Sequence, residues 1–143
     1  MADIIIIGGS IMGSSIAYHL AMTGRGGDIC VIEPDPSYEW AAAPRSSGGV
    51  RLMHGLPENI EMSRYGREVY KDFAALMDVD GQPGSFEFLE HGYLYLVAGG
   101  PEIAAAEENW RIQTGLGVPN DFLDRDQVAA RFPSMNVADI DAA

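Results

Sequence analysis

The sequence predicts an α/β fold that opens with two parallel strands joined by a helix. Four consecutive isoleucines at residues 4–7 are typical of a strand buried on both faces, as in a parallel sheet. Glycines follow at once, a helix-forming stretch covers residues 14–23, and a second apolar run at residues 28–32 ends at Glu33. This order of strand, glycine turn, helix, strand and acidic residue predicts a Rossmann-like βαβ unit that binds a dinucleotide.

The turn after the first strand carries the residue types that a dinucleotide phosphate site requires. Gly8 permits the tight bend, and Gly13 lets the helix pack closely on the strand. Free amides at the helix start attract a pyrophosphate, and Glu33 can accept hydrogen bonds from ribose hydroxyls. Ser10 stands at the second glycine position of the G-x-G-x-x-G pattern and so departs from it. Its Cβ crowds the approach of the backbone to the phosphates. The alternative interpretation is a glycine-rich turn in an unrelated α/β protein.

Composition narrows the class of protein. A chain of 143 residues suits one domain with a substantial core, and a net charge of -12 argues against a nucleic-acid partner. The one cysteine, Cys30, falls inside the second strand, where we expect a buried small hydrophobic residue and neither a disulfide nor a metal site. No signal peptide and no apolar run of about 20 residues is found, so we expect a cytoplasmic protein without a membrane span.

The middle of the chain predicts one long loop and two long helices. Residues 38–49 are small and lack periodicity, which is typical of a functional or disordered loop. Apolar spacing predicts a helix over residues 57–77 and another from Pro101 to about Gly115. Gly24 is expected to end the first helix of the chain.

Further elements follow from aromatic and capping patterns. Residues 86–90 and 92–97 are rich in aromatic side chains and predict strands of a second sheet. A capping-box pattern at residues 124–127 predicts a short helix that ends near Arg131. Only two strands of the parallel sheet have then been found, so the sheet is incomplete in this chain. We infer a piece of a longer protein, or a chain that needs a partner to finish the sheet.

Three segments, in order along the chain, resemble one known family. Residues 5–21 (IIIGGSIMGSSIAYHLA) resemble the N-terminus of the FAD-dependent D-amino acid oxidase, glycine oxidase and sarcosine oxidase superfamily. Residues 45–51 (RSSGGVR) are similar to the flavin-approaching loop of its sarcosine-oxidase-like branch, and residues 90–96 (EHGYLYL) resemble a strand of its substrate domain. The resemblance implies an FAD-binding portion at residues 1–80 and the beginning of an α+β substrate domain at 81–143.

The resemblance also implies roles for particular residues toward FAD. Glu33 would bind the adenosine ribose, and Arg51 matches an arginine that lies close to the isoalloxazine ring in relatives. The pyrophosphate would be held by Gly8, Gly9, Ser10, Ile11, Met12 and Gly13, and the flavin end would be reached by Ser46, Ser47, Gly48 and Gly49. His54 stands near where some sarcosine oxidases place an arginine for the substrate carboxylate, which leaves that role without a matching residue.

The reaction that the resemblance implies is oxidation of a C–N bond of a small amine or amino acid by hydride transfer to flavin. No catalytic residue is identified, and weak or absent turnover is expected for the isolated chain. Two alternatives remain open. An NAD-dependent dehydrogenase would also use Glu33, although it would normally continue with further βα units instead of the loop at residues 45–51. A non-catalytic fragment, or a subunit that supplies half of a flavin site, is the other.

Overall fold

The computed structural model describes all 143 residues, which form two compact units, residues 1–49 and residues 50–143. The predicted functional division near residue 80 differs from this division into compact units, and it stays a prediction. None of the helices is both long and apolar enough to cross a lipid bilayer.

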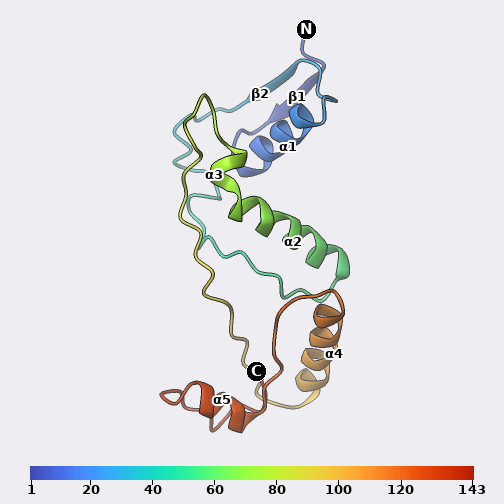
Figure 1. Cartoon of the computed structure of the whole chain (residues 1–143), viewed down its shortest axis with the longest axis vertical. Helices are drawn as coiled ribbons and strands as arrows, with labels where there is room; N and C mark the ends of the chain where they lie inside the picture. The colour runs from blue at the N-terminus through green and yellow to red at the C-terminus, as the bar shows by residue number, and fades with distance from the viewer. The chain divides into compact units, whose positions relative to one another are not determined.

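The first unit is the βαβ unit that the sequence predicts. Strands β1 (Ile4–Ile7) and β2 (Ile29–Ile32) pair in parallel, and helix α1 (Ile11–Met22) connects them and contacts both (Figure 1). The register sets Ile4 opposite Ile29 and Ile7 opposite Ile32. Gly24 takes the left-handed conformation (φ 65°) just past α1, as expected for a residue that ends a helix.

The predicted burial of the first strand on both faces is wrong for this chain. Only Ile6 is buried, with 8% of its surface exposed, whereas Ile5 and Ile7 are 60% and 87% exposed. Cys30 on β2 is exposed as well, against the expectation of a buried residue. The reason is the size of the sheet: with two strands and one helix, α1 covers one face and the other face has no covering layer.

The second unit is built from helices. These are α2 (Pro57–Lys71), α3 (Phe73–Leu76), α4 (Pro101–Gly115) and α5 (Arg125–Arg131). The helix predicted over residues 57–77 is therefore interrupted at Asp72, whose backbone leaves the helical region. Ile60 on α2 and Val128 on α5 are fully buried and centre the core of this unit.

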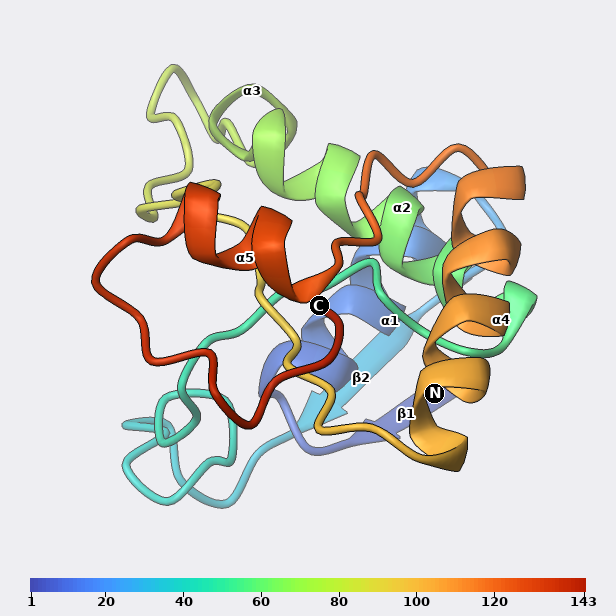
Figure 2. The same cartoon turned by 90° about the horizontal axis from the view of Figure 1, so that it is seen from below.

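Residues 86–96 form no strand, so the prediction of two strands there is wrong. The segment is extended, but only Val97 at its end pairs, with Ala142 near the C-terminus (N–O 2.9 Å). The physical reason is that this chain supplies no neighbouring strand for the segment. Ala143 also pairs with Leu123 (2.7 and 2.9 Å), which holds the C-terminal end beside α5 (Figure 2).

Candidate functional site

The glycine turn between β1 and α1 is closed by one close backbone contact. Gly8 adopts a left-handed conformation (φ 95°), and its amide donates to the Ile32 carbonyl at 2.8 Å. A methyl group on Gly13 would lie 1.8 Å from the Gly8 carbonyl oxygen, so only glycine fits there. The structure thus gives both glycines the backbone roles that the sequence predicts.

The start of α1 presents amides without a capping side chain. Ser10 is the N-cap residue, but its hydroxyl makes no capping hydrogen bond. The amides of the first helical turn have no partner within a helix, and with the helix dipole they favour an anion. Ser14, which no sequence motif marks, donates its hydroxyl to the Gly9 carbonyl at 2.6 Å and so stabilises the turn from the helix side.

Glu33 links the glycine turn to the segment that follows β2. Its Oε2 accepts a hydrogen bond from the Gly9 amide at 2.7 Å, and its Oε1 accepts one from the Asp35 amide at 2.9 Å. The carboxylate is partly buried. Each carboxylate oxygen has a further lone pair, so the group can still accept from hydroxyls of a ligand.

Asp35 organises the turn after Glu33. Its carboxylate accepts hydrogen bonds from the Ser37 hydroxyl (2.5 Å) and the Ser37 amide (3.0 Å), and its carbonyl accepts from the Tyr38 amide (3.0 Å). The Ser37 hydroxyl, which prefers the ionised carboxylate, is the main cause that lowers the pKa of Asp35 below its usual 3.8. The sequence offered a signal for this turn, since Asp35 lies between two prolines and is followed by Ser37, and Asp and Ser favour side-chain to backbone bonds.

The loop predicted to reach the flavin end forms local turns in the first unit. The Ser46 hydroxyl donates to Ala43 O at 2.9 Å and accepts from the Gly48 amide at 3.1 Å, with Gly48 at φ 66°. Arg45 lies over the ring of Trp40, 4.9 Å from its centroid, and both are exposed. Trp40 therefore does not pack in a core but supports a surface loop.

Arg51 lies in the second unit and contacts a tyrosine pair. Its guanidinium donates to the Tyr95 hydroxyl at 3.0 Å. The rings of Tyr93 and Tyr95 stack with centroids 6.3 Å apart. The expected role of Arg51 beside a flavin stays a prediction.

His54 is half-buried in the second unit. Its Nε2 pairs with the Ser63 hydroxyl at 3.0 Å, and its carbonyl accepts from Gln113 at 3.0 Å. Gln113 is buried and also accepts from Asn120 at 2.6 Å. His54 is thus tied into a polar network, which the sequence gave no means to foresee because its partners come from α2 and α4.

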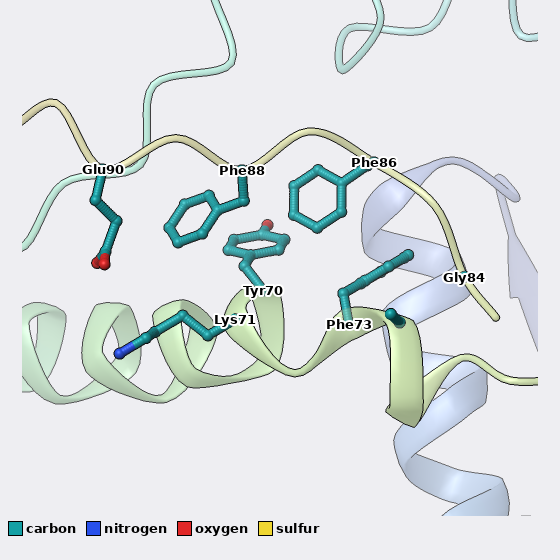
Figure 3. A pocket seen from close by; sticks show the side chains of 8 residues that line it. Tyr70, Lys71, Phe73, Gly84, Phe86, Phe88 and Glu90 are labelled. Carbon is teal, nitrogen blue, oxygen red and sulfur yellow. The ribbon is translucent and has the colours of Figure 1, made fainter.

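An open pocket of about 340 Å³ lies in the second unit between α2, α3 and residues 84–90 (Figure 3). Its wall is aromatic. The Tyr70 ring centroid is 5.4 Å from that of Phe86 and 5.8 Å from that of Phe88, and Phe73 is 4.8 Å from Phe86. Because these rings pack on one another at the usual edge and tilted geometries, we interpret the cluster as local packing.

Charged residues at the rim of this pocket are paired or exposed. Glu90 binds the Arg67 guanidinium on α2 at 2.5 Å, and Lys71 is exposed. The spacing of the rings was visible in the sequence, with Tyr70 and Phe73 three residues apart across the junction of α2 and α3, and Phe86 and Phe88 two residues apart on the segment after them.

Comparison with known proteins supplies the family. The sequence pattern of the family described as "DAO: FAD dependent oxidoreductase" matches residues 3–143. The chain is 35% identical over 139 residues to the FAD-dependent oxidoreductase domain-containing protein 1 homolog of Drosophila melanogaster, covering 96% of this chain and 26% of that protein. It is 34% identical over 139 residues to FAD-dependent oxidoreductase domain-containing protein 1 of Xenopus laevis, covering 94% of this chain and 28% of that protein.

A solved structure is similar over nearly the whole chain. The crystal structure of L-proline dehydrogenase from P. horikoshii matches with a TM-score of 0.78 and 25% sequence identity, covering 99% of this chain and 35% of that one. The chain thus spans about a quarter of the length of the curated relatives it matches.

Proposed function

The chain belongs to the DAO family of FAD-dependent oxidoreductases, and on that premise we propose that residues 1–49 form a Rossmann-like site for the ADP half of FAD. The observation that carries the proposal is the joining of the glycine turn to Glu33 by a 2.7 Å hydrogen bond. The family indicates FAD as the cofactor, which favours it over the NAD alternative.

The donors and acceptors of the turn fit this half of FAD. Amides at the start of α1 offer hydrogen bonds to phosphate oxygens, and Glu33 offers carboxylate oxygens to ribose hydroxyls. The contact of Gly13 with the Gly8 carbonyl holds the helix start at the end of β1, so the two groups of donors and acceptors keep a fixed spacing. Gly8, Gly9, Ser10, Ile11, Met12 and Gly13 would hold the pyrophosphate.

The reaction that we propose is oxidation of a C–N bond in an amine or amino acid. Support comes from the similar structure, which is that of an L-proline dehydrogenase. Bound FAD would supply the two-electron chemistry by accepting a hydride from the substrate carbon. Arg51 would place a fixed positive charge near the ring, which stabilises negative charge that develops there, and residues 46–49 would let the ring approach backbone amides. No residue is assigned as general base.

A second candidate is a chain that supplies half of a flavin site and has no turnover alone. Ile5 and Ile7 favour it, because a parallel sheet that exposes such side chains lacks a covering layer. We propose that further polypeptide, from a longer form of this chain or from a second chain, covers this face.

Titration of the purified chain with FAD, followed by calorimetry, tests the cofactor site. We expect binding by the wild type and a loss of about tenfold or more in affinity for Glu33→Gln, because the neutral amide replaces a charged acceptor. Glu39→Gln, an exposed glutamate in the same unit, is the matched control and should bind as the wild type does. A wild type that binds no FAD, or a Glu33→Gln variant that binds normally, contradicts the proposal.

Anaerobic mixing of the FAD-loaded chain with L-proline and a panel of primary and secondary amines tests the reaction. Loss of the yellow absorption of oxidised flavin with one of these compounds supports C–N oxidation. Binding of FAD without loss of colour for every compound supports the half-site candidate instead.

A further inference from the structure

Tyr38 lies against the glycine turn, and no motif in the sequence marks it. Its hydroxyl oxygen would be 2.9 Å from a methyl group placed on Gly9, and the Cβ of Glu33 would be 3.2 Å from that same methyl. Gly9 has an ordinary backbone, unlike Gly8, so the space taken by Tyr38 and Glu33 is what requires glycine there.

The chain holds Tyr38 in this place by a series of hydrogen bonds that begins at Glu33. Glu33 binds the Asp35 amide, Asp35 accepts from both donors of Ser37, and the Tyr38 amide donates to Asp35 O at 3.0 Å. Tyr38 itself has a positive φ of 57°, which is rare for a large side chain and is kept only where neighbours impose it.

The position differs from that of a core tyrosine. The side chain is half-exposed, and its hydroxyl oxygen is the atom nearest to the Cβ position of Gly9. A phenol hydroxyl donates one hydrogen bond and accepts others, so at this spot it adds a donor beside the amides of the turn and the carboxylate of Glu33.

We propose that Tyr38 is a binding residue for the adenosine diphosphate half of the dinucleotide, a role that rests on the proposed FAD site. The hydroxyl donates to the ribose–phosphate portion of the ligand. The ring covers the Glu33 side of the turn and limits the access of water to the carboxylate, which strengthens its hydrogen bonds to ribose.

The test compares the full chain with Tyr38→Phe, which keeps the ring and removes the donor. Calorimetry gives dissociation constants for FAD and for ADP, and urea unfolding checks stability. We expect Tyr38→Phe to weaken both ligands by about five- to tenfold and by the same factor, because the lost hydrogen bond serves the half that they share. Tyr65→Phe, an exposed tyrosine on α2, is the matched control and should bind as the wild type does.

The binding results distinguish failure of the proposed FAD site from failure of the role of Tyr38. A wild type that binds neither FAD nor ADP overturns the proposed site, and the role of Tyr38 with it. A wild type that binds both, with Tyr38→Phe unchanged or tighter, overturns the role of Tyr38 alone. A variant that loses FAD but keeps ADP places the hydroxyl outside the shared half and also overturns the inference. Tyr38→Ala should weaken both ligands further than Tyr38→Phe, and an equal effect of the two variants contradicts the proposed covering role of the ring.

Discussion

At the scale of single residues, the first unit depends on a few side chains that hold backbone groups at short range. Glu33 accepts hydrogen bonds from the amides of Gly9 and Asp35. Gly13 leaves room for the Gly8 carbonyl, where any side chain would collide with it. Such positions tolerate little change, because a buried acceptor left unpaired or an added methyl group each costs stability.

Two glycine-to-alanine changes in helices should have opposite effects. Gly13→Ala should destabilise the first unit by about 1–3 kcal/mol, because its methyl group meets Gly8 O. Gly66→Ala on α2 meets no atom within 4 Å and should stabilise its helix by about 1 kcal/mol, the usual difference in helix propensity. Urea unfolding followed by circular dichroism checks both. A Gly13→Ala variant as stable as the wild type contradicts the close packing described for the turn.

The turn at Asp35 should respond to acid. The Ser37 hydroxyl holds the pKa of the Asp35 carboxyl below its usual 3.8, so the ionised form is favoured by the fold. The stabilisation is therefore present above the usual value and is lost as the pH falls through the lowered pKa. Ser37→Ala should raise the pKa of Asp35, as an NMR titration of its carboxyl would show. Ser85→Ala in the other unit should leave that titration unchanged.

At the scale of elements, the sequence predicted the features that depend on nearby residues and failed for strands that need a distant partner. The capping box of α5 is present as predicted, with Asp124 accepting from the Gln127 amide and Gln127 accepting from the Asp124 amide, both at 2.9 Å. The βαβ order and the ends of α4 and α5 were predictable because they depend on residues close in sequence, whereas the break at Asp72 within the helix predicted over residues 57–77 was not predicted. The strands predicted at residues 86–97 were not found, because a strand needs a partner that alternation of side chains does not supply.

The capping box gives a prediction for α5. Asp124→Ala should cost about 1 kcal/mol and speed amide exchange across residues 125–131, because it removes the acceptor of the first turn. Asp124→Asn keeps an oxygen acceptor and should retain most of the protection. Hydrogen exchange read by NMR distinguishes the two. Equal protection in the wild type and Asp124→Ala would show that tertiary contacts, and not the cap, hold this helix.

At the scale of the whole molecule, the candidate site was only partly predictable. The turn and Glu33 come together as expected because the βαβ order alone brings them there. The roles expected for residues 46–49 and Arg51 stay predictions. Tyr38 and Asp35 were missed as site residues because the sequence signals the turn at residues 34–37 but not that this turn brings the Tyr38 side chain to Gly9.

The exposed face of the sheet leads to a prediction about association. Ile5→Lys should reduce self-association with little loss of stability, because the side chain is 60% exposed and a lysine discourages contact between apolar faces and strand edges. Ile6→Lys, one residue along and 8% exposed, should unfold the first unit instead. Sedimentation velocity and circular dichroism separate the effects. Unchanged association of Ile5→Lys would exclude this face as the contact surface.

The contact between Gly13 and the Gly8 carbonyl has a consequence for how a nucleotide would be selected. The end of β1, the turn and the start of α1 pack together without a ligand. The conformational entropy of ordering them is therefore lost on folding and not on nucleotide binding. Discrimination among nucleotides would then depend on how well each one complements a single fixed conformation of this part of the site.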